Sequence, residues 1–253
     1  MLRSFDRAVR PAYLLAAVLA ATVAGGFAVA FAADEASKQP VILVTGFEPF
    51  GGKAENSSWE GAKSLDGKEV GGMKVVAVRL PVVWQKAGDE LAAAVAKHRP
   101  SAVVCFGQGR PEGVSVEKVA LNLRRPRLPD NEGKLRPSEK VVEGGPDRYD
   151  TPEPVDEVVK AVRAVKVDAG SSTDAGGYLC NEVFYRIEHI RHAGEHRPAA
   201  CFFVHVPAIG DVTASGRTYD ARAASEVALA VVQVAARLAA GKAEPAPQPA
   251  GKR

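Results

Sequence analysis

The chain has 253 residues, of which 46% are hydrophobic and 25% charged, and its net charge is +3. These fractions are ordinary for a globular protein and exclude a wholly disordered, collagenous or polytopic membrane chain. The small charge, with arginine and lysine scattered rather than striped, argues against a nucleic-acid groove. Three cysteines cannot form a closed disulfide framework, so at least one thiol is free.

Residues 1–33 differ in composition from the rest of the chain. Three arginines within the first ten residues form a basic start, and the uncharged stretch 12–33 is rich in Ala, Val and Leu. The small residues of Ala30-Phe31-Ala32 match a signal-peptidase site. This layout predicts a cleaved signal peptide and a periplasmic or secreted protein. Because the stretch is also long enough to span a bilayer, an uncleaved membrane anchor is the alternative.

The other end of the chain also differs from the middle. Residues 241–253 are rich in Pro and Ala and carry no large apolar side chain, so we expect a disordered tail. The sequence therefore predicts three parts: a signal peptide at 1–33, one folded domain at 34–240, and the tail.

Strand-like and helix-like segments alternate through the predicted domain. Short β-branched runs predict strands at 40–45, 75–78, 102–106, 114–123, 165–169 and 200–206. Apolar residues at helical spacing predict helices at 84–97, 153–165, 178–192 and 223–239. This alternation indicates an α/β fold, a single three-layer α/β/α domain with a mostly parallel central sheet. Functional sites in such folds lie at the carboxyl ends of the strands.

Cys180 is the first candidate for a catalytic residue. It follows the glycine-rich turn 174–177 and stands at the predicted start of a helix. The helix dipole and the free backbone N–H groups there favour a thiolate and could hold an oxyanion. Cys105 and Cys201 lie inside apolar runs, as buried structural cysteines do. From the local pattern alone, a structural role for Cys180 stays open as well.

His205 and Glu117 are the next candidates. His205 ends the apolar run 200–204, where a general base for a cysteine nucleophile could lie. Glu117 is an acid among β-branched residues and could orient an imidazole. Each residue, taken alone, also has a plainer interpretation: His205 as a core histidine with satisfied hydrogen bonds, and Glu117 as a solvated side chain.

Three other patterns carry weaker signals. His189 and His192 have i, i+3 spacing, but no third metal ligand accompanies them. The stretch 107–110 follows a strand as phosphate loops do, but it lacks the G-x-G-x-x-G spacing. Ser115 and Ser172 lack the G-x-S-x-G surroundings of a serine nucleophile.

Taken together, the segments resemble pyroglutamyl peptidase type I, the pyrrolidone-carboxylate peptidase family of cysteine peptidases. The resemblance spans about 41–235 and rests on several blocks that occur in the family's order. These are VTGFEPFGG at 44–52, EKVALN at 117–122, RLPDNEG at 127–133, AGGYLCN at 175–181 and HVP at 205–207. The resemblance implies an enzyme that removes N-terminal pyroglutamyl residues from peptides, without a metal or organic cofactor.

The same resemblance implies roles for the catalytic candidates. Cys180 would be the nucleophile, His205 its base and later the acid, and Glu117 the carboxylate that orients the imidazole. Such a site would carry out acyl transfer from the peptide to the cysteine and then to water.

The resemblance also implies a substrate site. Phe47 and Phe50 fall on the aromatic positions that sandwich the lactam ring, and Gln108 falls on a residue that lines the ring pocket. Arg127 falls on the family's arginine near the catalytic centre. A flat, uncharged ring buries well between two phenyl faces. Plain core packing is the alternative for both phenylalanines.

The chain departs from the family at several places. The stretch between Gly107 and Glu117 is one residue shorter, and the pair Arg124-Arg125 replaces acidic residues, which would make the pocket wall more basic. Familiar members also lack a signal peptide. Two alternatives therefore stay open: a hydrolase that keeps the triad but takes another small acyl or cyclic amide substrate, and a catalytically silent periplasmic binding protein. The family commonly forms dimers or tetramers, so a homo-oligomer is possible here too.

Overall fold

The computed structural model describes residues 39–125, 127–136 and 138–242. Its main sheet has seven strands in the order β2-β3-β1-β4-β9-β5-β8, and most neighbouring pairs are parallel. The strands are β1 (Val41–Phe47), β2 (Glu69–Val70), β3 (Met73–Leu80), β4 (Ala102–Gln108), β5 (Val114–Glu117), β8 (Ala169–Ser172) and β9 (Ala200–Val206). Two pairs are antiparallel, β2 with β3 and β5 with β9.

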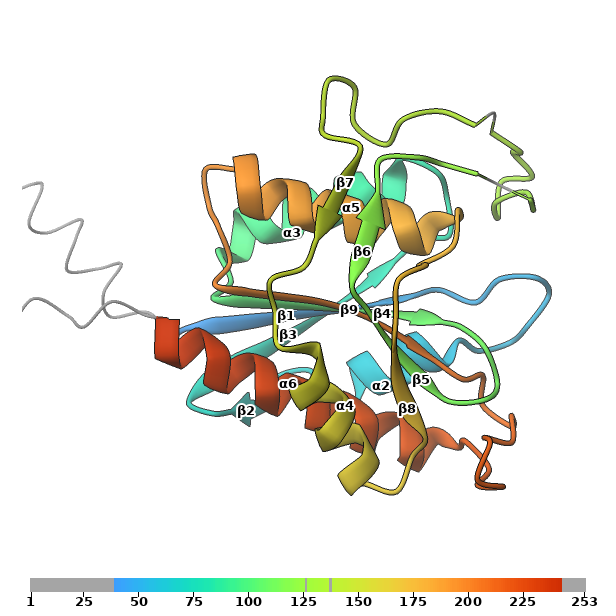
Figure 1. Cartoon of the computed structure of the whole chain (residues 1–253), viewed down its shortest axis with the longest axis vertical. Coiled ribbons are helices and arrows are strands. Elements are labelled where there is room, and N and C mark those ends of the chain that lie inside the picture. Colours follow the sequence, from blue (N-terminus) through green and yellow to red (C-terminus); the bar gives the residue numbers. More distant parts are fainter. Residues whose placement is uncertain (1–38, 126, 137, 243–253) are drawn as a thin grey trace, which may run out of the picture. The chain divides into compact units, whose positions relative to one another are not determined.

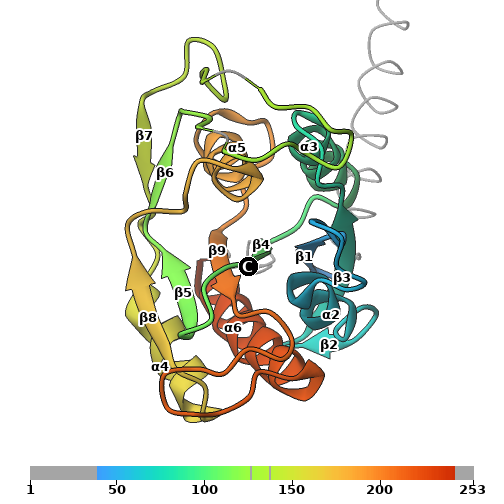
Figure 2. The ribbon, with the colours of Figure 1, turned by 90° about the vertical axis from the view of Figure 1, so that its right-hand side faces the viewer.

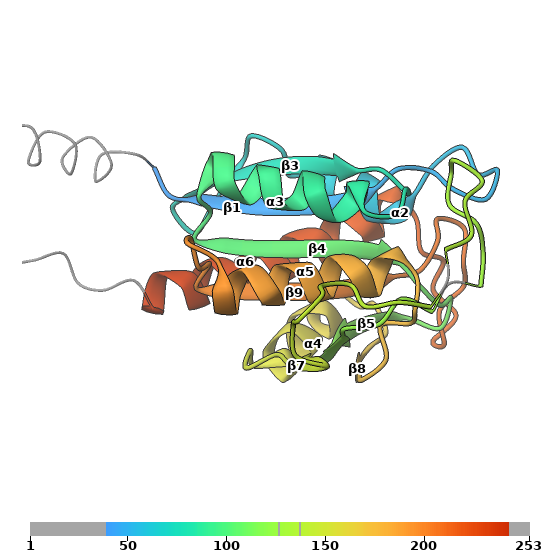
Figure 3. The same ribbon diagram turned by 90° about the horizontal axis from the view of Figure 1, so that it is seen from above.

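Helices cover both faces of this sheet (Figures 1 and 2). The helices are α2 (Ser57–Lys63), α3 (Lys86–His98), α4 (Val155–Ala164), α5 (Leu179–Ala193) and α6 (Ala221–Lys242). Helices α3 and α5 lie on one face, side by side in Figure 3, while α2, α4 and α6 lie on the other. The predicted three-layer α/β/α fold with a mostly parallel sheet is confirmed.

The two layers follow from the alternation of side chains along the buried strands. Strands covered on both faces read as continuous apolar runs, as β1, β4 and β9 do. Successive residues then face opposite layers. Phe202 and Val204 of β9 pack under α2, α4 and α6, whereas Cys201 and Phe203 pack under α3 and α5. His205 follows in this pattern, so it lies on the α3 and α5 face.

Helix α6 is long and apolar enough to cross a membrane, judged by length and composition alone. Its apolar side chains instead fill the core: half of its residues are buried, and it packs against α2, α4 and the sheet. Its apolar character is therefore explained by the fold.

The structure corrects two of the predicted strands. The run 114–123 does not form one strand, because it leaves the main sheet at Lys118 after β5 and continues as β6 (Val119–Leu121). β6 pairs with β7 (Arg148–Asp150) in a separate antiparallel ribbon. The strand predicted at 165–169 lies further along, at β8, because Lys166 adopts a left-handed backbone with φ of 64° that a strand does not tolerate.

Polar motif residues hold the long connection between β6 and β7. The Asn122 amide donates to the carbonyls of Val142 and Gly145, and its oxygen accepts from the N–H groups of Val141 and Val142. Asp130 accepts from the N–H groups of Trp84, Glu132 and Lys134. Side chains here replace the hydrogen bonds that a sheet would supply.

The terminal predictions fall mostly outside the described residues. The predicted signal peptide at 1–33 lies outside them, as does the tail from 243 onward. Helix α6 continues to Lys242, two residues into the segment that the sequence analysis assigned to the tail. Short elements that the sequence analysis did not predict are α2, β2 and β7.

Candidate active site

His205 and Glu117 meet because β5 runs antiparallel to β9. Ser115 pairs with His205 in the register of these strands, so Glu117 lies diagonally across from His205 on the same face of the sheet. His205 Nδ1 and Glu117 Oε1 are 2.8 Å apart. The Glu117 side chain is 1% exposed, so one buried carboxylate fixes the orientation of the imidazole.

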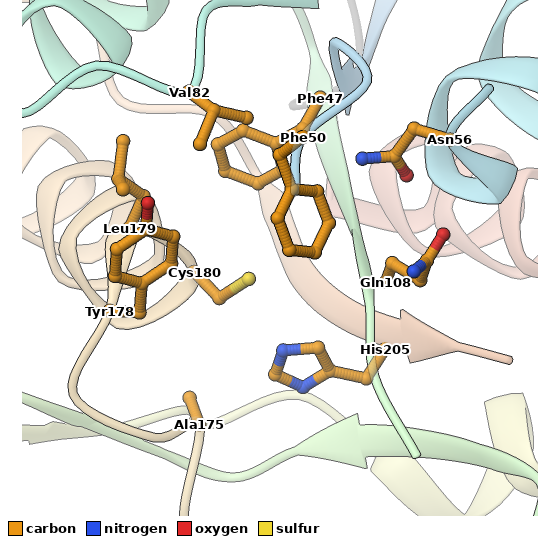
Figure 4. Close-up of a pocket in the computed structure, with 10 residues that line it drawn as sticks. All are labelled: Phe47, Phe50, Asn56, Val82, Gln108, Ala175, Tyr178, Leu179, Cys180 and His205. Atoms are coloured by element: carbon orange, nitrogen blue, oxygen red, sulfur yellow. The ribbon is translucent and has the colours of Figure 1, made fainter. Parts of the chain in front are cut away.

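Cys180 reaches the same face from above the sheet. It lies in the first turn of α5, whose N-cap residue Tyr178 makes no side-chain capping hydrogen bond. The backbone N–H groups of this turn therefore stay free of side-chain caps and can donate to an anion. Cys180 and His205 line the same pocket. In Figure 4 the two side chains point toward one another from α5 and β9.

Two glycines let the strand β4 and the loop after it pass close to the catalytic pair. A Cβ on Gly107 would lie 2.8 Å from Cys180 Sγ and 3.0 Å from a ring carbon of Phe203. A Cβ on Gly109 would lie 2.7 Å from the Cβ of His205. Any larger residue would displace the cysteine or the histidine. The sequence Gly107-Gln108-Gly109, which resembled a phosphate loop, thus makes room for this pair.

A pocket of about 180 Å³ opens beside the cysteine. This volume is smaller than the roughly 300–1,000 Å³ of sites for drug-sized ligands, so it suits a small group. Figure 4 shows Phe47 and Phe50 on the side opposite His205. The lining residues are Phe47, Phe50, Asn56, Val82, Gln108, Ala175, Tyr178, Leu179, Cys180 and His205.

The charge state of His205 reflects its two partners. Burial by itself lowers the pKa of His205. The Cys180 sulfur, through its charge and a hydrogen bond, acts in the opposite direction, as does the hydrogen-bonded Glu117 carboxylate. Together they raise the pKa from 6.5 to about 10. The imidazole is therefore protonated at neutral pH.

Asn181 and Tyr178 hold the start of α5 in place. The Asn181 amide donates to the carbonyls of Leu121 and Leu123, and its oxygen accepts from the N–H of Leu121. The Tyr178 hydroxyl donates to the carbonyl of Pro129 at 2.9 Å. These bonds come from both sides of Cys180 in sequence, so they fix where its sulfur points.

The two arginines expected to make the pocket wall more basic have different positions. Arg124 is buried, and its guanidinium contacts Glu182 at 2.8 Å and Glu139 at 3.1 Å. The expectation is wrong for Arg124, because its charge is paired with Glu182 and Glu139 inside the fold. Arg125 is exposed and lines a neighbouring hollow, which Arg127 lines too. Arg127 is not among the residues that line the pocket beside Cys180.

The structure brings together five of the seven candidates around one pocket: Phe47, Phe50, Gln108, Cys180 and His205. Glu117 stands behind His205, and Arg127 lies in the next hollow. The sequence analysis did not single out Asn56 or Tyr178 as pocket residues. Asn56 caps α2 by accepting from the N–H of Ser58, and its position before two serines is a recognisable capping signal.

The weaker candidates fall elsewhere. His189 Nδ1 contacts the Tyr149 hydroxyl at 3.0 Å, and His192 stacks on the Tyr149 ring. Among residues 39–125, 127–136 and 138–242, no group of three or more His, Cys, Asp or Glu side chains could hold a metal ion. Ser115 and Ser172 line a neighbouring hollow beside Glu117, and neither lines the pocket beside Cys180.

The other two cysteines differ from Cys180 in their surroundings. All three are free thiols, but Cys105 and Cys201 are completely buried. Burial raises the pKa of Cys105 to about 12 and that of Cys201 well above its usual value. Both thiols therefore stay protonated and inert, as the apolar runs around them indicated.

Comparison with known proteins points in the same direction as this geometry. The sequence profile of the family described as pyroglutamyl peptidase matches residues 40–242. A pyrrolidone-carboxylate peptidase of Coprothermobacter proteolyticus is 40% identical over 202 residues, which cover 79% of this chain and 96% of that protein. One from Gloeobacter violaceus is 41% identical over 167 residues, which cover 66% of this chain and 80% of that protein.

Solved structures give the same result. Pyroglutamyl peptidase I of Bacillus amyloliquefaciens superposes with a TM-score of 0.71 at 32% identity, over 79% of this chain and 98% of that one. The pyrrolidone carboxyl peptidase of Thermococcus litoralis superposes with a TM-score of 0.72 at 30% identity, over 83% and 99% of the two chains. Fold and relatives together define the class: this protein is a cysteine peptidase. More narrowly, the chain belongs to the pyroglutamyl peptidase family.

Proposed function

We propose that this protein is an exported omega-peptidase that removes N-terminal pyroglutamyl residues from peptides through Cys180, His205 and Glu117. The observation that carries the proposal is the meeting of Cys180 and His205 on the wall of a small pocket that has two phenylalanines on its far side. A flat, uncharged lactam ring suits such a pocket, because phenyl faces bury it without leaving a charge unpaired.

The first half of the reaction is acylation of the cysteine. The Cys180 thiolate attacks the carbonyl carbon that follows the lactam ring and forms a carbon–sulfur bond, while the carbonyl electrons move to the oxygen. Backbone N–H groups in the first turn of α5 stabilise this oxyanion. When the oxyanion collapses, the carbon–nitrogen bond breaks and the His205 imidazolium gives its proton to the leaving amine.

The second half releases the product. Neutral His205 accepts a proton from a water molecule as that water attacks the thioester. The carbon–sulfur bond then breaks, which frees pyroglutamate and restores the Cys180 thiolate beside a protonated imidazole. Glu117 touches no reacting atom: it is a positioning residue, which keeps His205 oriented and favours its protonated form through their 2.8 Å contact.

Release of a fluorescent amine from a pyroglutamyl amide by the purified protein, under reducing conditions, tests this proposal. Cys180→Ala should abolish turnover. Cys201→Ala is the matched control, because it removes a thiol that is buried away from the pocket, and it should keep most of the activity. A folded protein whose Cys180 reacts with iodoacetamide but which shows no turnover would refute the pyroglutamyl substrate. The substrate would then be another small acyl or cyclic amide compound.

Export is the second part of the proposal. It is supported by the basic start, the apolar stretch 12–33 and the small residues of Ala30-Phe31-Ala32. Expression of the full chain in a bacterial host, followed by fractionation and mass measurement, tests it. We expect a periplasmic product that has lost roughly the first 32 residues. A full-length product in the membrane fraction would indicate an anchor, and one in the cytoplasm would refute export.

A further inference from the structure

Three hollows meet around the loop that leads into Cys180. The first is the pocket beside the cysteine. The second shares Ala175 and His205 with it, and the third shares Tyr178 with it. We call the third hollow the arginine cleft, because Arg110, Arg125 and Arg127 all line it. The cleft therefore adjoins the catalytic pocket directly.

A peptide held by its first residue must leave the catalytic pocket through a neighbouring hollow. On the proposed function, the lactam ring fills the small first pocket and its carbonyl stands at Cys180. The rest of the peptide then runs outward, with each extended residue covering about 3.3–3.6 Å. The hollows that adjoin the pocket are where the leaving part of the substrate can lie.

The arginine cleft carries positive charge that is not paired within the described part of the protein. The side chains of its three arginines make no hydrogen bond or ion pair with any residue that the structure describes, whereas the neighbouring Arg124 is fully engaged inside the fold. The opposing charge in the cleft is Asp174, whose carboxylate accepts the N–H of Gly176. Three free guanidinium groups against one carboxylate leave the cleft positive.

Arg125 is held firmly at the wall of this cleft. Its backbone N–H donates to the carbonyl of Gly177 at 2.8 Å. A Cβ on Gly177 would lie 2.6 Å from the Cβ of Arg125, so the two segments are in the closest contact a glycine allows. Gly177 stands three residues before the nucleophile. The position of the Arg125 backbone is therefore tied to that of Cys180, which lowers the cost of ordering a ligand there.

We propose that the arginine cleft is a specificity site for a carboxylate in the leaving part of the substrate, with Arg125 and Arg110 as its principal groups. This inference rests on the proposed function and adds the substrate class: pyroglutamyl peptides that carry a negative charge shortly after the scissile bond. The planar guanidinium group binds carboxylates through two parallel hydrogen bonds, which gives orientation as well as attraction. The carboxylate can come from an acidic side chain or from the C-terminus of a short peptide.

A matched set of substrates separates the two sources of the carboxylate. Pyroglutamyl-glutamate amide against pyroglutamyl-glutamine amide tests the side chain, and pyroglutamyl-alanine against its amide tests the C-terminus. We expect kcat/KM to be about three- to tenfold higher for the charged member of at least one pair at low salt, mainly through KM. The preference should shrink as salt is added, because the arginines are exposed.

Variants of the cleft test whether the arginines cause this preference. Arg125→Gln should lower the ratio of charged to neutral kcat/KM to about two, and Arg125→Gln with Arg110→Gln should bring it close to one. Arg125→Lys keeps the charge and should retain part of the ratio. Lys160→Gln is the matched control, since this exposed lysine lies on α4, on the opposite face of the sheet, and it should change nothing.

The outcomes for this inference and for the proposed function are distinct. Failure to cleave any member of the set would refute the proposed function. Cleavage of charged and neutral members at equal kcat/KM would keep that function and overturn the arginine cleft as a specificity site. A preference that persists in the double variant would overturn the assignment of Arg125 and Arg110 as the groups that bind the carboxylate.

Discussion

The buried glutamates at the two ends of helix α5 differ in their hydrogen bonding and in their charge. At its start, the Glu182 carboxylate accepts from the Gln85 N–H and from Arg124 Nε, so both oxygens are bonded. Near its end, Glu188 is fully buried, and among the described residues neither of its oxygens has a hydrogen bond within 3.5 Å, while His192 Nε2 lies 3.8 Å from Oε2. Its neighbour Glu153 takes the contact with Arg191, at 2.6 Å.

The burial of Glu188 affects its ionisation. Burial raises the pKa of Glu188 to about 7, and the charge of Arg191 opposes this only in part. The start of the helix therefore carries paired charges that fix a geometry, next to the nucleophile. Its end holds a carboxyl group that avoids the cost of burial by keeping its proton. The catalytic end of α5 is the end where the helix's own buried carboxylate, Glu182, is paired by tertiary contacts.

The largest expected effect is a loss of stability when Arg124, which pairs with Glu182 at the start of α5, is removed. Arg124→Met leaves the Glu182 charge buried and unpaired, so we expect the free energy of unfolding in urea to fall by about 3–5 kcal/mol. The double variant Arg124→Met with Glu182→Leu should recover much of that loss. Arg148→Met is the control, because the Arg148 pair with Asp150 is exposed. A loss for Arg124→Met as small as for this control would contradict the role of the buried pair.

Gly107→Ala should damage the catalytic end without unfolding the protein. The new methyl group would lie 2.8 Å from Cys180 Sγ, so the sulfur must move away from its productive position. We expect kcat/KM for a pyroglutamyl amide to fall about 100-fold. Gly170→Ala in β8 meets no atom within 4 Å and should leave the rate unchanged. Equal rates for the two variants would mean that the Cys180 sulfur is not displaced from its productive position by the new methyl group.

Glu117→Gln should change the pH profile as well as the rate. The hydrogen bond and charge of Glu117 help to raise the pKa of His205 to about 10, so the neutral amide should lower that pKa. We expect kcat/KM to fall about 30-fold at neutral pH, and the loss of activity at high pH to begin at a lower pH. A variant with a reduced rate but an unshifted profile would assign Glu117 a purely structural role.

Glu188→Gln should have the smallest effect, confined to stability. The folded protein keeps the Glu188 proton up to a pKa of about 7, while the unfolded chain releases it near 4.5. The folded state thus binds more protons between these values, so the free energy of unfolding should fall as pH rises from 4.5 to 7, by about 2 kcal/mol. Glu188→Gln should remove that decrease, whereas the exposed control Glu143→Gln should keep it. Peptidase activity should not respond to either change.

Much of the site could be predicted because the family's motifs are local. VTGFEPFGG carries both phenylalanines, and AGGYLCN carries the glycine turn, the cysteine and the asparagine that anchors it. The error on Arg124 has a different cause: two adjacent arginines look alike in sequence, yet one points into the fold and the other into a cleft. The single strand predicted at 114–123 failed because no local signal marks where a chain leaves one sheet for another.

Local sequence patterns are enough to predict the layers of the fold and the chemical groups available to it. Apolar periodicity depends on nearest neighbours along the chain, so strands β1, β4 and β9 and helices α3, α5 and α6 could be predicted from it. How those groups meet depends on contacts between distant parts of the chain. The antiparallel register of β5 against β9 sets Glu117 diagonally beside His205, and the passage of Gly107 under Cys180 sets the sulfur above it. Such contacts join residues far apart in the chain, and packing of the whole fold fixes them.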